Sequence, residues 1–173
     1  VEEEGPQVDA EKVRIEKTLK HFAAFEKRVW GELLEKLEKE GTPAAVEVCK
    51  GVAVGLDQEF ASLEGVRVRR VGTRLRNPAH RPDEWEQKVL DDWQKLMGQR
   101  LPLDVVSEET PGGLRIMKPI IIHKRVCLRC HGAINEILPA TRDRLKEAYP
   151  NDKAVDYELG DLRGGFSAIW PRN

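Results

Sequence analysis

The chain has 173 residues, which suits one domain with a substantial hydrophobic core but not two such domains. Its 29 basic and 30 acidic residues nearly cancel, and no Lys/Arg block is long enough to form a basic arm, so nothing indicates a nucleic-acid partner. No stretch approaches the roughly 18 consecutive apolar residues of a membrane-spanning helix.

The first part of the chain is expected to be helical. Residues 1–7 (VEEEGPQ) predict a flexible tail, and residues 8–173 are expected to form a single domain. The start at Val1 is typical of a polar stub left after a leader is removed, although an arbitrary boundary would look the same. From Val8 to about Glu40, apolar residues recur at spacings of three and four, which predicts an amphipathic helix. They are Ile15, Leu19, Phe22, Phe25, Val29 and Leu33.

A second helix is expected to follow directly. Gly41 suits the position just past the first helix, Thr42 is expected to cap the second, and Pro43 fits its first turn. We expect this helix to reach about Leu63. Its apolar stripe consists of Ala45, Val48, Cys49, Val52, Leu56 and Phe60.

After Gly65 the pattern changes from helical to alternating. Residues 66–76 (VRVRRVGTRLR) alternate apolar and basic side chains, which is typical of a half-buried strand. Asp83 then suits the cap of a helix that is expected to end near Gly98.

The C-terminal half predicts more strands than helices. Residues 101–123 read as two strands around a TPGG turn, and residues 160–170 as a turn and a final strand. Between them, residues 134–149 predict a helix that is interrupted or kinked at Pro139. Helices beside an antiparallel sheet place the protein in the α+β class.

The stretch CLRCHG, residues 127–132, carries the main chemical signal. A thioredoxin-type dithiol would need a βαβ unit, which the pattern lacks. A zinc site is a stronger alternative, with His123, Cys127, Cys130 and His131 as possible ligands. Zinc sites, however, usually join two ligand pairs separated by a dozen or more residues.

The third interpretation is covalent haem, because C-x-x-C-H is the attachment signature of c-type haem. Positions i, i+3 and i+4 share one face of a helical turn. Cys127 and Cys130 can therefore form two thioethers while His131 offers a ring nitrogen to the iron from the same side. We favour one covalently bound haem c. Such attachment takes place outside the cytoplasm, so the protein is expected in the periplasm or a lumen.

The chain also resembles a family of single-haem c-type proteins with a PAS-like fold, over about residues 15–171. Members of that family occur as free lumenal or periplasmic proteins and as sensor domains of membrane-bound signalling proteins. The resemblance is carried by AVEVCK around Cys49, by residues 74–86 and 149–171, and by the haem motif. Two positions depart from the family pattern: His80 stands where Asn is expected and Asp156 where Gly is usual. The resemblance implies a PAS-like antiparallel sheet with N-terminal helices.

Cys49 is left over once the thioethers are formed. By itself it is as well explained as a small buried hydrophobe, and His21, His80, His123, Met97 and Met117 are further candidates for the sixth iron ligand. The family resemblance implies His on one side of the iron and Cys on the other, with Cys49 as the distal ligand. Lys50 would help to keep the thiolate, unless it points to solvent from another face of the helix.

These expectations favour a protein that is not an enzyme, because the sequence shows no acid/base pair or nucleophilic triad and both axial positions would be filled. The first candidate role is a low-potential electron carrier, whose redox partner protein the sequence does not identify. The alternative is a redox or gas (NO or CO) sensor that signals through a partner. The chain contains no signalling segment, which favours the carrier.

Overall fold

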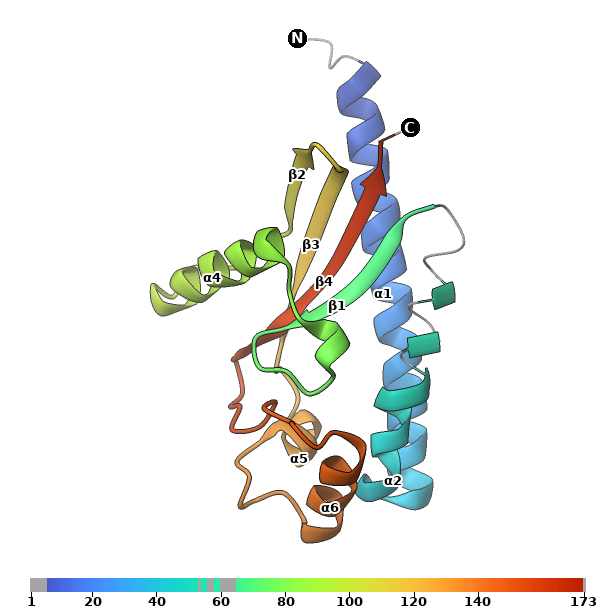
Figure 1. Ribbon diagram of the computed structural model, residues 1–173, viewed down its shortest axis with the longest axis vertical. Coiled ribbons are helices and arrows are strands. Elements are labelled where there is room, and N and C mark those ends of the chain that lie inside the picture. Colours follow the sequence, from blue (N-terminus) through green and yellow to red (C-terminus); the bar gives the residue numbers. More distant parts are fainter. Residues whose placement is uncertain (1–5, 53, 56–57, 60–64, 173) are drawn as a thin grey trace.

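The computed structural model describes residues 6–52, 54–55, 58–59 and 65–172. Its four strands form one antiparallel sheet in the order β1-β4-β3-β2 (Figure 1), so the predicted α+β class and antiparallel sheet are confirmed. The helices are α1 (Pro6–Glu40), α2 (Thr42–Glu47), α4 (Glu84–Gly98), α5 (Leu128–His131) and α6 (Pro139–Ala148), with the short turns η1 (Val48–Val52), η2 (Pro78–His80) and η3 (Arg125–Cys127). The strands are β1 (Arg67–Gly72), β2 (Val106–Thr110), β3 (Gly113–Ile121) and β4 (Leu162–Pro171).

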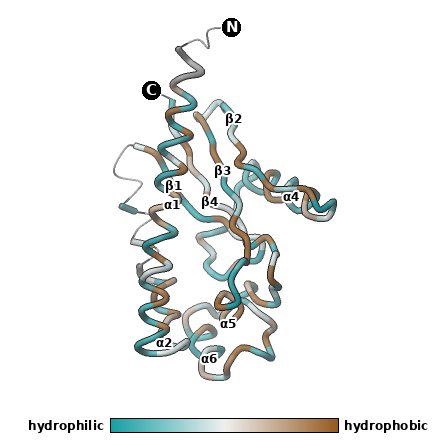
Figure 2. The backbone as a smooth tube through the Cα atoms, turned by 180° about the vertical axis from the view of Figure 1, so that it is seen from behind, coloured by the Kyte–Doolittle hydropathy of each residue, from teal (hydrophilic) through white to brown (hydrophobic). Residues whose placement is uncertain are grey.

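The long helix α1 runs the length of the molecule and covers one face of the sheet (Figure 1). Hydrophilic and hydrophobic residues alternate along it (Figure 2), as expected for a helix that buries one side. Phe22 and Phe25 pack on Phe166 of β4, with ring centroids 5.2 and 5.6 Å apart. The helix begins at Pro6, so residues 6 and 7 belong to it and not to the predicted tail. Residues 1–5 lie outside the described residues.

The second helix differs from its prediction at both ends. Gly41, with φ 85°, occupies the N-cap position, and Thr42 is already helical and makes no capping hydrogen bond. A cap residue must adopt a non-helical conformation, and glycine adopts this one more easily than threonine. After Glu47 the chain enters a π-helical turn, η1. Residues 54–55 and 58–59 are helical again, and the predicted end at Leu63 lies outside the described residues.

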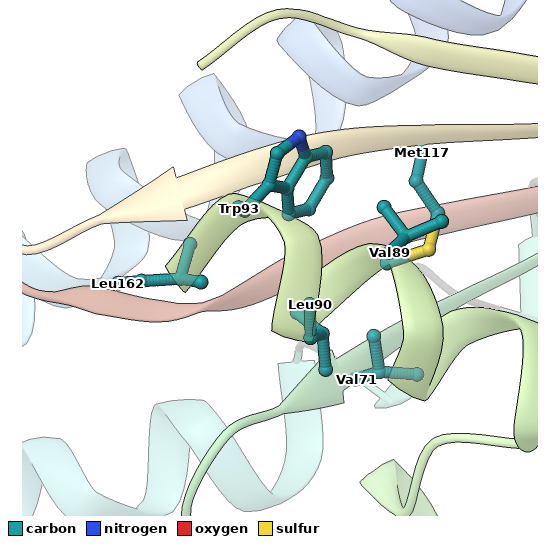
Figure 3. Packing of buried hydrophobic residues seen from close by; sticks show 6 residues of the cluster. All are labelled: Val71, Val89, Leu90, Trp93, Met117 and Leu162. Atoms are coloured by element: carbon teal, nitrogen blue, oxygen red, sulfur yellow. The ribbon is translucent and has the colours of Figure 1, made fainter. Parts of the chain in front are cut away.

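The opposite face of the sheet is covered by α4. Val71 of β1 and Met117 of β3 face this helix and pack with Val89, Leu90 and Trp93 (Figure 3). Asp83 caps α4 as predicted, and it does so in a reciprocal capping box with Glu86. The molecule therefore has three layers: α1, the sheet and α4.

The C-terminal half agrees with its predictions except at one proline. The β2–β3 hairpin and the last strand, β4, are present. Pro139, however, starts α6 and does not kink it. A proline at the first helical position lacks an N–H that would have had no intrahelical partner in any case. The residues before it form a turn.

Helices α2, α5 and α6 gather beyond one end of the sheet (Figure 1). Val46 of α2 packs there with Ile137, Leu145 and Tyr149. Segments from opposite halves of the sequence thus meet beside the haem-type motif. Among the described residues, no helix has the length and apolar character needed to cross a bilayer.

Candidate functional site

A cavity of about 220 Å³ lies between α1, the α2–η1 segment, the sheet and the motif. The residues that the sequence singled out, Cys49, Cys127, Cys130 and His131, all line it. Helix α1 supplies an apolar wall, formed by Phe25, Val29, Trp30, Leu33 and Leu37. The tertiary structure therefore brings the leftover cysteine and the C-x-x-C-H motif to one mainly apolar site, which is where most ligand sites are found.

The motif folds as one compact helical unit. Cys127 ends the turn η3, and Cys130 and His131 close the short helix α5. Gly132 ends the unit with a hydrogen bond from its N–H to the Leu128 carbonyl (2.9 Å). A Cβ at Gly132 would lie 2.5 Å from that carbonyl oxygen, so the turn requires glycine. The expectation that the two cysteines and the histidine share one helical turn agrees with this geometry.

His131 is oriented through its Nδ1 atom, which lies 2.8 Å from the carbonyl oxygen of Ala154 and can only donate to it. In the part of the chain that the structure describes, no hydrogen bond reaches its Nε2 atom. Burial, together with the charges of Arg163 and Arg76, lowers the pKa of His131 well below its usual value. The ring is therefore neutral with a lone pair on Nε2, which is the arrangement that metal-binding histidines use.

Arg76 stabilises the backbone of the motif through hydrogen bonds. One of its terminal nitrogens, Nη2, donates to the carbonyl oxygens of Cys130 (2.6 Å) and Ala154 (3.1 Å). Its Nε donates to the Asp152 carboxylate (2.9 Å). The Ala154 carbonyl thus accepts from both Arg76 and His131. Sequence reasoning assigned Arg76 no role, because nothing in the pattern around it reveals the distant carbonyl groups that it binds.

The segment at residues 152–157 supports the motif with its backbone. The N–H groups of Asp156 and Tyr157 donate to the carbonyl groups of Gly132 (2.8 Å) and His131 (2.9 Å). Asp156 has φ 60°, a left-handed conformation that Gly adopts freely and Asp tolerates. This explains why Gly is expected here. The Asp156 side chain adds a contact that Gly lacks, by accepting from the Ile134 N–H (3.0 Å).

The two motif cysteines do not have the features of a reactive dithiol. Burial raises the pKa of Cys130 to about 11, and burial also raises the pKa of Cys127. Redox-active C-x-x-C motifs depend on a lowered thiol pKa, and the sheet beside this motif is antiparallel. The dithiol interpretation is therefore disfavoured. No group of three or more His, Cys, Asp or Glu among the described residues is arranged to hold a metal ion such as zinc.

Cys49 lies on the π-helical turn η1 and is half-buried. Such turns are rare and are frequently found at functional sites. Lys50 next to it is exposed, which agrees with the alternative that its side chain points to solvent. The sequence showed the apolar stripe of this helix but not the change of helical type within it.

Some of the other candidates for the sixth iron ligand line the cavity, and others do not. His80 and His123 also line the cavity. Met117 belongs to the cluster between α4 and the sheet (Figure 3), and Met97 packs against the same cluster. His21 lies on α1 outside the cavity lining. Burial and the charges of Arg70, Arg163 and Arg69 lower the pKa of His80 to about 3.

Comparison with known proteins agrees with the family resemblance drawn from the sequence. The structure is similar to the crystal structure of the cyanobacterial heme-protein Tll0287, with a TM-score of 0.72 and 24% identity over 98% of each chain. A search of curated proteins found no match. The model of the Tll0287-like family (Tll0287) matches residues 7–171, and because this is nearly the whole chain, the protein belongs to the Tll0287-like family.

Proposed function

We propose that this protein is an exported c-type cytochrome with one covalently bound haem, and that it carries single electrons at low potential. The observation that carries the proposal is the convergence of Cys127, Cys130, His131 and Cys49 on one apolar cavity. The haem supplies an iron that changes between its ferric and ferrous states. The heme-protein Tll0287, which has a similar fold, supports the assignment of this cofactor.

Each residue has a separate role in the proposed site. Cys127 and Cys130 anchor the porphyrin as thioethers, and His131 offers Nε2 to the iron because the Ala154 carbonyl holds its Nδ1. Cys49 would offer a thiolate from the α2–η1 segment. A thiolate donates electron density and lowers the reduction potential relative to a Met ligand. If His131 and Cys49 both bound the iron, no position would remain for peroxide, so we propose a carrier and not an enzyme.

Covalent attachment tests the proposal most directly. The protein is produced in a host with c-type maturation and then extracted with acidified acetone. Haem should stay with the polypeptide, and the intact mass should exceed that of the chain by one haem. In a Cys127→Ala/Cys130→Ala control, pigment should pass into the acetone. A colourless wild-type protein that carries zinc would refute the proposal.

A sensor is the second candidate, and the π-helical turn at Cys49 favours it. Such turns are frequently found at functional sites, and release of a ligand held by this one would change the α2–η1 segment. Carbon monoxide distinguishes the two roles. A carrier keeps its six-coordinate ferrous spectrum under CO, whereas a sensor binds CO and shows altered hydrogen exchange in α2 and η1.

A further inference from the structure

The described residues that line the cavity are unbalanced in charge. They include four arginines, Arg70, Arg76, Arg129 and Arg163, but a single carboxylate, Glu26. That carboxylate is within 3.6 Å of Lys118, which already compensates it. Positive charge beside apolar walls is costly unless an anion is brought to it. The cavity is therefore built for a ligand with an apolar body and anionic groups.

Three of these arginines are less suited to binding an anionic group of the ligand, because each already has a partner or is exposed to solvent. Arg76 is occupied by Asp152 and two carbonyl groups. Arg129 is exposed, so solvent screens its charge. Arg70 lies over the ring of Phe25, with its guanidinium carbon 5.2 Å from the ring centroid.

Arg163 is held in place by its surroundings but lacks a carboxylate. Its Nη1 donates to the Arg74 carbonyl (3.1 Å), and its guanidinium carbon lies 5.5 Å from the centroid of the Tyr157 ring. Gly72 makes room for it, because a Cβ there would lie 2.8 Å from Nη1. Throughout the described ranges, no Asp or Glu lies within ion-pair distance of Arg163.

The environment of Arg163 favours the arrival of an anion. Burial lowers the pKa of Arg163, Tyr157 partly opposes this shift, and the neighbouring charges of Arg76 and Arg70 add to it. A carboxylate would relieve this electrostatic cost and accept charge-assisted hydrogen bonds from the planar guanidinium. Haem carries two carboxylates, its propionates, on an otherwise apolar ring.

We propose that Arg163 is the counter-ion that receives a propionate of the bound haem. This inference rests on the proposed function, because it takes haem as the ligand. It assigns Arg163 a binding role that the motif and the family resemblance do not contain. Since a cation near the haem favours the electron-rich ferrous state, Arg163 also raises the reduction potential and partly offsets the effect of a thiolate ligand.

The test follows the propionate itself. The haem-loaded full chain is produced with δ-aminolevulinate carrying ¹³C in its carboxyl group, which labels the haem propionates. Redox-difference infrared spectra and midpoint potentials are then recorded for the wild type, Arg163→Gln, Arg163→Lys and the cavity control Arg129→Gln. Arg163→Gln should shift a labelled carboxylate band and lower the potential at both low and high salt. Arg129→Gln should leave the bands in place, and any change in its potential should disappear at high salt.

Two outcomes separate this inference from the proposed function. If mass spectrometry finds no covalent haem, the proposed function itself fails. If haem is attached but the labelled bands of Arg163→Gln match those of the wild type, Arg163 does not bind a propionate and only this inference is overturned. Arg163→Lys keeps the charge, so it should fold and retain a band close to that of the wild type even if Arg163→Gln folds poorly.

Discussion

At the scale of single residues, the site depends on hydrogen bonds that fix the orientation of its side chains. His131 is aimed by one backbone carbonyl, that of Ala154, and Arg76 binds the same oxygen. The ring is thereby fixed in one tautomer with Nε2 available, as in other sites where an outer hydrogen bond orients a metal ligand. Cys49 lies on a π-helical turn, and no hydrogen bond to its side chain is found among the described residues. The two proposed axial ligands therefore differ in rigidity, and Cys49 is the one expected to move.

The first prediction concerns Cys49→Ala. Haem should remain covalently attached, because Cys127 and Cys130 are untouched. The midpoint potential should rise by on the order of a few tenths of a volt, since a thiolate ligand is lost. The ferrous protein should bind CO. Potentiometry and absorption spectra measure these changes.

Two controls bound the interpretation of Cys49→Ala. Cys49→Ser should be nearly as disruptive, because a neutral hydroxyl is a poor iron ligand. Lys50→Gln changes an exposed neighbour and should leave the spectrum and the potential unchanged. If Cys49→Ala keeps the wild-type ferric spectrum, the thiol only packs, and His80 or His123 must be tested as the ligand in its place.

At the scale of elements, helix α4 is fixed by a charged cluster at its start. Asp83 accepts from the N–H of Glu86 (2.9 Å) and from Arg115 (2.6 Å). Glu86 is only 1% exposed, and it accepts from the Ser167 hydroxyl (2.6 Å) and the Asp83 N–H (2.8 Å). Arg69 and Arg115 lie 3.4 Å from its carboxylate oxygens. This cluster ties the start of α4 to three strands of the sheet, β1, β3 and β4.

The pH dependence of stability should report on this cluster through Asp83→Asn. Burial alone would raise the pKa of Asp83, but hydrogen bonds from Arg115 and Glu86 outweigh it and lower that pKa. A lowered pKa stabilises the folded protein above the unfolded value of 3.8, and this contribution is lost as the pH falls through the folded value. Asn still caps the helix but loses the ion pair, so the free energy of unfolding should drop by at most about 1 kcal/mol at pH 7.

Urea unfolding at a series of pH values measures the difference between the wild type and Asp83→Asn. The difference should be largest at pH 7 and disappear below the folded pKa of Asp83. Arg115→Gln removes the same contact from the other side and also removes a cation 3.4 Å from the buried Glu86 carboxylate, so it should lower the free energy of unfolding more than Asp83→Asn does. A difference that stays constant over the whole series would show that the ion pair contributes nothing.

At the scale of the whole molecule, the cavity joins parts of the chain that are far apart in sequence. Cys49 belongs to the N-terminal helical segment, whereas Cys127, Cys130 and His131 follow the central hairpin. Helix α1 and the sheet both line this space, in addition to packing directly on each other through Phe22, Phe25 and Phe166. A ligand bound from both sides would therefore link the helical layer to the rest of the fold and stabilise the native state by its binding free energy.

The last prediction compares the Cys127→Ala/Cys130→Ala protein, freed of any non-covalently bound haem, with the wild type. Its free energy of unfolding should be lower by about 3 kcal/mol or more, and hydrogen exchange in α2 and η1 should be faster. Denaturant titration and exchange followed by mass spectrometry measure these effects. Cys49→Ala keeps the haem but loses the bond from residue 49 to the iron, so its free energy of unfolding should lie between those of the other two proteins. Equal unfolding midpoints for all three proteins would show that the fold does not depend on the ligand.

Features encoded by neighbouring residues were predictable from the sequence alone. The periodicity of α1, the presence of a strand at β1, the Asp83 cap and the C-x-x-C-H turn are each set by local geometry, and each agrees with the structure. The strand predicted over residues 66–76 is shorter, however, because β1 ends at Gly72, and burial along it does not alternate. Predictions failed where two local signals competed. Pro139 is compatible with both a kink and a start, and Gly41 and Thr42 are both acceptable cap residues.

The tertiary structure alone decided what surrounds the motif. The Ala154 carbonyl that holds His131 has no sequence signature, because every residue carries the same acceptor. The pairing of Arg76 with Asp152, the approach of Cys49 to the cavity and the room that Gly72 leaves for Arg163 all depend on chain segments far apart in sequence. The sequence by itself determined which groups could attach a haem. Long-range packing decided which atoms face the cavity, because those contacts form only when the helices and the sheet close around the same space.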